Sequence, residues 1–272
     1  MKKERADKLL VQQGFADSID KAQRMIMTGK VITDKNERID TAGEKIPFNT
    51  TFRIKGAQMK YVSRGGYKLE KAMDVFDVDF KDKILLDIGS STGGFTDAAL
   101  QYGAKLSYAL DVGTNQLAWK LRQDSRVVVM EQTNFRYSQA KDFIQGKPDV
   151  ASIDVSFISL KLILPVLKEI ICEHGDVIAL IKPQFEADRD DVGSKGIIRS
   201  LDVHKKVLED ILLFATETGY DVLGLDFSPI TGGEGNVEFL AHLRSVDQTK
   251  GQMNPIVDID QTIQQAYATF LN

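Results

Sequence analysis

Residues 85–96 read Leu85-Leu86-Asp87-Ile88-Gly89-Ser90-Ser91-Thr92-Gly93-Gly94-Phe95-Thr96, and this stretch decides the fold class. An apolar run precedes the glycines and a helix-forming segment follows them, which predicts a strand, a tight loop and a helix. Glycines in such a loop let the backbone approach a ligand closely. A dinucleotide-binding fingerprint would carry glycine where Ser91 stands, so that class of loop is not matched. The remaining interpretations are a different cofactor loop or an ordinary strand-to-helix turn.

The segments around this loop alternate between strand and helix patterns. Expected strands cover 84–87, 106–111, 126–130, 150–154, 177–181, 223–227 and 237–242, and expected helices 67–76, 95–102, 116–122, 160–171, 202–218 and 259–271. Short apolar strands joined by helices are typical of a parallel sheet covered on both faces. The last two strands are joined by a Pro/Gly-rich turn instead, which favours an antiparallel pair. We therefore predict an α/β fold with a seven-stranded, mostly parallel sheet.

The N-terminal residues predict a separate small α+β domain. Residues 4–13 and 18–28 have helical patterns, with Ser18 as the N-cap of the second helix, and short strands follow at 31–32 and 52–54. We place this domain at 1–58, a linker at 59–66 that ends in two glycines, and the larger domain at 67–272.

Charge is distributed unevenly over a chain whose net charge is −4. Residues 1–68 hold 15 Lys and Arg against 8 Asp and Glu, so the first part is basic and the remainder acidic. A basic module suggests a polyanionic partner, although an imbalance without a partner is an equally open interpretation.

Composition narrows the class of protein further. The longest apolar run, Val177-Ile178-Ala179-Leu180-Ile181, is too short for a membrane-spanning helix, and the charged N-terminus does not read as a secretion signal. One cysteine, Cys172, rules out an intramolecular disulfide and a cysteine zinc site, which fits the cytoplasm. The three histidines show no metal-ligand spacing, so we expect no metal.

The pattern D-x-G-x-x-x-G-G, in which Asp87 is the acidic residue that ends the strand, resembles motif I of Rossmann-like methyltransferases. The resemblance implies S-adenosylmethionine as cofactor, with its methionine part beside Asp87, Gly89, Ser90, Ser91, Gly93, Gly94 and Phe95. Asp111 ends the next strand, where a carboxylate can accept both ribose hydroxyls. Asn134 is a weaker candidate for the adenine edge, since asparagine is common in turns.

Four charged residues stand where a parallel sheet would gather them: Lys68, Asp154, Lys182 and Glu238. A ribose 2′-hydroxyl must lose its proton during attack on a sulfonium methyl, and a neutral lysine can accept that proton. We expect Lys182 in this role, Lys68 favouring its neutral form by repulsion, and the carboxylates orienting both amines. Asp154 also adjoins the cofactor. Each residue alone could equally be part of a surface ion pair.

In this order the four residues resemble the Lys-Asp-Lys-Glu tetrad of FtsJ-like 2′-O-methyltransferases. The N-terminal segment, with Arg5-Ala6-Asp7-Lys8-Leu9-Leu10 and Lys21-Ala22-Gln23-Arg24-Met25-Ile26, is similar to an S4 RNA-binding domain. The combination, with Ser63-Arg64-Gly65-Gly66-Tyr67-Lys68-Leu69 at the junction, resembles the TlyA family. The family implies methylation of cytidine ribose in ribosomal RNA or a ribosomal subunit, and it also carries a haemolysin label. Met59 and Tyr61 depart from the family linker, which often carries Arg and Trp.

RNA contacts are expected from cations on the small domain, at the linker and on one loop of the larger domain. The candidates are Arg5, Lys8, Lys21, Arg24, Lys30, Arg64 and Lys195, each weighed against a merely solvated charge. The segment 186–197, which carries Lys195, is expected to be a mobile loop near Lys182. Phe157 and Phe185 could stack on a flipped base or belong to the core.

Three other functions remain open on these observations. A membrane-active haemolysin would need a spanning or lytic helix, and the segment 259–271 reads better as a cover for the sheet. A non-catalytic RNA-binding factor would have no need of the tetrad. A base methyltransferase would carry an Asn/Asp-Pro-Pro-aromatic segment or a catalytic cysteine, whereas Cys172 is expected within an apolar helix.

Overall fold

The computed structural model describes residues 3–16, 18–33, 37–48, 50–55, 59–193, 196–232 and 235–270. The chain divides into two compact units, Met1–Met59 and Lys60–Asn272. Each unit has its own buried apolar core.

The smaller unit combines two helices with two short antiparallel strand pairs. Its elements are β1 (Lys3–Arg5), α1 (Ala6–Gln12), α2 (Ile19–Met27), β2 (Val31–Thr33), β3 (Lys45–Pro47) and β4 (Phe52–Ile54), with β1 paired to β3 and β2 to β4. Ser18 caps α2 as predicted, by accepting a hydrogen bond from the Lys21 backbone N–H. The helix predicted from residue 4 begins only at Ala6, because residues 3–5 pair with β3, whose single isoleucine gives no strand pattern.

The larger unit contains the predicted seven-stranded sheet, in the order β10-β11-β9-β8-β5-β6-β7. Its strands are β5 (Ile84–Ile88), β6 (Leu106–Leu110), β7 (Val127–Met130), β8 (Val150–Ile153), β9 (Asp176–Ile181), β10 (Tyr220–Phe227) and β11 (Phe239–Ser245). Only β11 runs against its neighbours, and it pairs antiparallel with both β9 and β10. This confirms a mostly parallel sheet with an antiparallel pair at its end.

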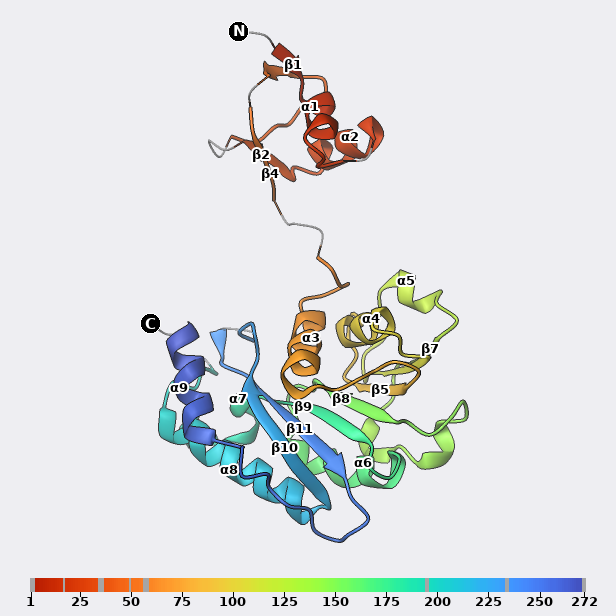
Figure 1. Cartoon of the computed structure of the whole chain (residues 1–272), viewed down its shortest axis with the longest axis vertical. Coiled ribbons are helices and arrows are strands. Elements are labelled where there is room, and N and C mark those ends of the chain that lie inside the picture. The colour runs from red at the N-terminus through yellow and green to blue at the C-terminus, as the bar shows by residue number, and fades with distance from the viewer. Residues whose placement is uncertain are drawn as a thin grey trace. The chain divides into compact units, whose positions relative to one another are not determined.

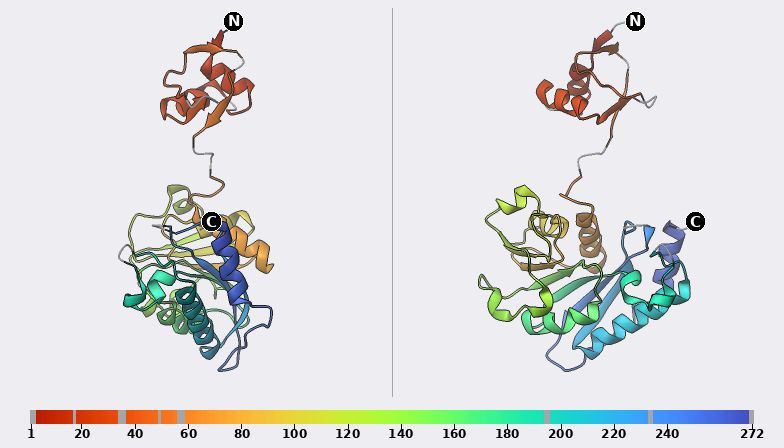
Figure 2. Two further views of the ribbon diagram at one scale, coloured as in Figure 1. Left: turned by 90° about the vertical axis from the view of Figure 1, so that its left-hand side faces the viewer. Right: turned by 180° about the vertical axis from the view of Figure 1, so that it is seen from behind.

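Helices cover both faces of this sheet (Figures 1 and 2). They are α3 (Gly65–Phe76), α4 (Gly94–Gln101), α5 (Trp119–Arg122), α6 (Leu164–Ile170), α7 (Pro183–Glu186), α8 (Leu201–Glu217) and α9 (Ile259–Phe270). Leu85 belongs to a buried cluster with Leu69 of α3, while its neighbour Leu86 belongs to another with Leu167 of α6 and Leu208 of α8. Alternate residues of a strand face opposite sides of the sheet, so both faces of an apolar strand such as β5 are buried.

Some predicted boundaries are wrong. The helix expected at 116–122 begins only at Trp119, and the one expected at 160–171 is a 3-10 turn at Leu160–Leu162 followed by α6. Cys172 lies after the end of α6 rather than within a helix. Glu238 immediately precedes β11 instead of lying inside it.

The predicted linker is also too long. Only residue 59 falls on the small unit's side of the division, and the larger unit begins at Lys60. Tyr61 is 2% exposed within the cluster that contains Leu69, and the Val62 N–H donates to Asp97 Oδ2 of α4 at 2.8 Å. Helix α3 begins at Gly65, two residues earlier than expected. Residues 60–66 therefore pack on the larger unit, because a buried tyrosine anchors them.

Candidate active site

The strand order creates a cleft at the centre of the sheet. The chain continues from β5 to β6 on one side, and β8 flanks β5 on the other. The connections that follow β5 and β8 therefore diverge, and ligands of open α/β sheets bind at such switch points. The glycine loop follows β5, and Asp154 follows β8, so both border this cleft.

Two glycines shape the loop between β5 and α4. Gly89 has φ of +84°, and a Cβ there would lie 2.5 Å from the backbone oxygen of Asp154. Gly93 has φ of +96°, and a Cβ there would lie 2.3 Å from Leu121 Cδ1. The loop therefore passes close to the β8 connection on one side and packs on α5 on the other, which only glycine permits at these positions.

Asp87 is a buried carboxylate beneath the loop. Its Oδ2 accepts hydrogen bonds from the backbone N–H and hydroxyl of Thr96, and its Oδ1 accepts one from Ser152. Burial raises the pKa of Asp87 to about 6, against the opposing effect of these hydrogen bonds. Asp87 thus ties β5 to the first turn of α4 and holds the loop from below.

A second carboxylate, Asp111, fixes the loop from the side of β6. It accepts hydrogen bonds from the backbone N–H groups of Ser91, at 2.8 Å, and Gly113, at 2.7 Å. Asn134 Oδ1 accepts from the backbone N–H and Nε of Arg136, so its carbonyl is already engaged. Asp111 and Asn134 line the same cavity of about 770 Å³, where sequence reasoning placed the ribose and adenine.

The four predicted catalytic side chains form one network. Lys68 comes from the first turn of α3, while Asp154 follows β8, Lys182 follows β9 and Glu238 precedes β11. Lys182 Nζ lies 2.6 Å from Asp154 Oδ1. Lys68 Nζ lies 3.5 Å from Asp154 Oδ2 and 2.7 Å from Glu238 Oε2. The last contact is an ion pair without hydrogen-bond alignment, since Glu238 Oε2 has no hydrogen-bond partner among the described residues.

Burial makes this network costly to break. The side chain of Glu238 is 3% exposed and that of Lys68 is 9% exposed. Charges at such depth persist only when they are paired. Asp154 contacts both lysines, so its carboxylate opposes the repulsion expected between them.

The network opens into a second cavity of about 350 Å³ beside the glycine loop. All four charged residues line it, together with six of the seven residues predicted around the cofactor's methionine part: Asp87, Gly89, Ser90, Ser91, Gly94 and Phe95. The seventh, Gly93, lines neither cavity and packs against Leu121 instead. The two cavities adjoin, because four residues border both of them: Gly89, Ser91, Asp154 and Ser156.

The groups that line these cavities are of the kinds that the predicted cofactor needs. A carboxylate stands in the larger cavity where ribose hydroxyls need an acceptor. Gly89 and Ser91 of the glycine loop border both this cavity and the smaller, charged one. The support for this cofactor therefore comes from the residues that line the two cavities.

Sequence reasoning missed Ser156, which accepts a hydrogen bond from Lys182 Nζ at 3.1 Å. Its spacing of two residues from Asp154 was the available signal. Phe157 follows with φ of +63°, an unusual conformation for a bulky side chain, and is 90% exposed at the rim of the larger cavity. Its ring centroid lies 4.9 Å from that of Phe185. Phe157 is therefore not a core aromatic.

The predicted RNA-contacting cations differ in their surroundings. Lys8, Lys30 and Arg64 are exposed, and Arg64 borders the smaller cavity. Arg24 pairs with Asp20 at 2.5 Å, and Arg5 donates to the buried Asp7, which lowers the pKa of that carboxyl. Lys21 is partly buried.

The remaining candidate, Lys195, lies outside the described residues. The loop around it is anchored at two places. Lys206 of α8 bonds Asp188 and Asp191, and the Asn236 side chain bonds Gly196 and Ile198.

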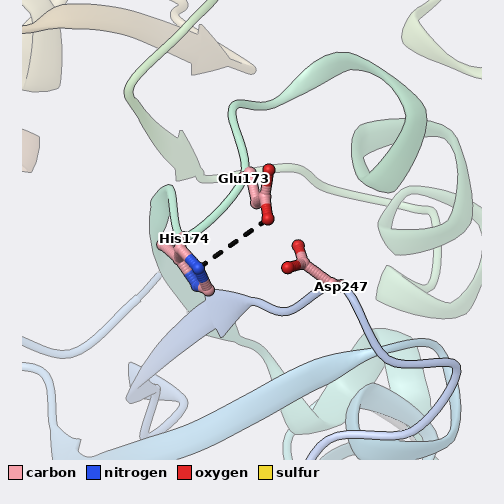
Figure 3. A group of neighbouring side chains, drawn as sticks. All are labelled: Glu173, His174 and Asp247. Atoms are coloured by element: carbon pink, nitrogen blue, oxygen red, sulfur yellow. Dashed lines mark ion pairs between the residues drawn. The ribbon is translucent and has the colours of Figure 1, made fainter.

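A cluster that the sequence did not predict lies at the other end of strands β9 and β11. The cluster consists of Glu173, His174 and Asp247, and one potential metal-ligand atom from each lies within 4.8 Å of the others. Figure 3 shows the three side chains together. The Asp247 carboxylate raises the pKa of Glu173. All three side chains are exposed, and exposed acidic groups often gather without an ion, so we assign the cluster no role.

The chain is similar to known methyltransferases. Residues 61–245 match the family described as FtsJ-like methyltransferase. A Bacillus subtilis (strain 168) protein named "Putative rRNA methyltransferase YqxC" is 56% identical over 98% of this chain and 95% of its own length. The Mycobacterium tuberculosis protein named "16S/23S rRNA (cytidine-2'-O)-methyltransferase TlyA" is 36% identical over 89% of this chain and 90% of its own.

A solved structure covers both units. It is titled "Putative hemolysin from Streptococcus thermophilus" and is 54% identical, with a TM-score of 0.77 over 99% of this chain and 98% of that one. Among the described residues, no helix is long and apolar enough to cross a bilayer.

Proposed function

The chain belongs to the FtsJ-like methyltransferase family, and within it to the TlyA family, and we propose that it methylates the 2′-hydroxyl of a cytidine ribose in ribosomal RNA. The observation that carries the proposal is the paired Lys68–Glu238 and Lys182–Asp154 network beside the glycine loop. S-adenosylmethionine, when bound, supplies an activated methyl group on sulfur. Asp111 would hold its ribose, and the Gly89–Gly94 loop its methionine part.

The four charged side chains have different roles toward the target hydroxyl. Lys182 Nζ, held by Asp154, accepts the proton that the 2′-oxygen loses during attack. The Lys68–Glu238 pair also lines the smaller cavity and keeps the Lys68 amine near the developing oxyanion. Water excluded from this partly buried site cannot compete for the same contacts.

RNA as the substrate is supported by an aromatic ring at the larger cavity and by lysines of the small unit. Exposed Phe157 offers its ring to a base that has been turned out of an RNA stack. The small unit, which we take to be an S4-like RNA-binding domain, presents Lys8 and Lys30 to phosphates. The named relatives suggest ribosomal RNA or a ribosomal subunit as partner, and hence action in the cytoplasm.

Methyl transfer from labelled S-adenosylmethionine to ribosomal subunits and to naked ribosomal RNA tests the proposal. Digestion of the product to nucleosides should place the label on cytidine ribose. Lys182→Ala should abolish transfer while leaving cofactor binding intact. The control Lys205→Ala, which removes a half-buried lysine paired with Asp260, should leave transfer unchanged. Label on a base, or full activity of Lys182→Ala, would refute the assigned chemistry.

A further inference from the structure

Lys182 Nζ has two acceptors within the site. Asp154 Oδ1 lies at 2.6 Å and Ser156 Oγ at 3.1 Å. Both acceptors come from the same short segment after β8, and Ser156 borders both cavities. The Lys182 side chain is 10% exposed, so little water competes for these contacts.

We infer that Ser156 is a positioning residue that fixes the direction in which Lys182 accepts the proton. The inference rests on the proposed function. A neutral amine has two N–H groups and one lone pair, arranged tetrahedrally about nitrogen. With one N–H donated to Asp154 and the other to Ser156, the lone pair is confined to the remaining direction.

One acceptor would not suffice for this. With Asp154 alone, one hydrogen bond fixes rotation about the Cε–Nζ bond, but the second N–H and the lone pair can still exchange places, so the lone pair has two directions open to it. Asp154 also faces Lys68 at 3.5 Å, so its position is shared between two amines. A second acceptor, Ser156 Oγ at 3.1 Å, engages the second N–H and so leaves the lone pair a single direction. Proton transfer depends on this kind of alignment, and small misplacements lower rates strongly.

The local backbone supports the assignment. Phe157, next to Ser156, has φ of +63°, so the chain turns sharply as soon as the serine has been placed. Such conformations persist only where surrounding contacts hold them. Glu186 provides one of these contacts, because it accepts a hydrogen bond from the Leu160 N–H at 2.8 Å and so holds the far end of the same loop.

The test compares steady-state constants of Ser156→Ala, Ser156→Thr and the exposed-serine control Ser125→Ala in the full-length chain with ribosomal RNA. Ser156→Ala should lower kcat by about tenfold to a hundredfold, with the KM for S-adenosylmethionine unchanged, because only alignment in the transition state is lost. Ser156→Thr keeps the hydroxyl and should recover most of kcat.

An unchanged kcat in Ser156→Ala would overturn the inference, as would equal losses in the alanine and threonine variants, which would indicate a steric role. A rise in KM without a fall in kcat would also overturn it. Lys182→Ala, measured in parallel, distinguishes failure of the positioning role from failure of the proposed function. If it is inactive while Ser156→Ala is normal, only the positioning role fails, whereas its full activity refutes the proposed function itself.

Discussion

Replacement of Asp87 by asparagine should change how the stability of the larger unit depends on pH. The carboxyl is fully buried between β5 and α4, and burial raises its pKa from 3.8 to about 6. Folding therefore favours the protonated form. Below the unfolded pKa, both states hold the proton and no penalty arises. Above that value the unfolded chain loses its proton first, so stability falls as pH rises, until the folded carboxyl also ionises near pH 6.

The magnitude follows from the size of the shift. Each pKa unit corresponds to about 1.4 kcal/mol, so a shift of about two units costs the ionised state about 3 kcal/mol. The three hydrogen bonds that Asp87 accepts offset part of the burial penalty, and their effect is already contained in the pKa. An asparagine does not ionise. Its Oδ1 can still accept from Thr96, while Ser152 can rotate to accept from the new amide.

The measurement is urea unfolding of wild type and Asp87→Asn between about pH 4 and pH 8, followed by circular dichroism and by Trp119, the single tryptophan. The free energy of unfolding of the variant, relative to wild type, should rise by about 2–3 kcal/mol across this range. Exposed Asp79→Asn is the control and should show no such trend. A constant difference between wild type and Asp87→Asn would refute the reasoning.

Three further changes test other parts of the site. Gly93→Ala should weaken S-adenosylmethionine binding in calorimetry because its Cβ meets leucine side chains, whereas Gly14→Ala, also at positive φ but in open space, should not. Lys68→Ala should lower the free energy of unfolding by about 3 kcal/mol, since it leaves the buried Glu238 carboxylate without its partner. Adding Glu238→Gln to this variant should restore much of the lost free energy. Equal stability of the single and the double variant would contradict the pairing. Lys8→Ala should reduce the salt dependence of RNA binding by about one unit of slope, and an unaltered slope would exclude a phosphate contact.

Local sequence patterns predicted most of the larger unit. Apolar runs of strand length, alternating with helical periodicity, indicated seven strands and the helices between them, and the structure confirms a mostly parallel sheet. Errors occurred where long-range pairing or packing overrides local preference. The strand at residues 3–5 exists because β3 pairs with it, and residues 60–66 are ordered because Tyr61 is buried.

The sequence likewise predicted some features of the candidate site and not others. Lys68, Asp154, Lys182 and Glu238 could be named from the sequence because strand ends in parallel sheets border a cleft and because the set resembles a known tetrad. The sequence alone did not reveal that Asp154 would contact both lysines.

The sequence by itself determined the βα alternation, the glycine loop and the identity of the charged residues, because these depend on neighbours a few positions apart. Only the tertiary structure decided the order of the strands, the hydrogen bond from Lys182 to Ser156 and the exposure of Phe157. Those features join segments dozens of residues apart, and a contact of that kind depends on how the whole sheet is assembled rather than on any local preference.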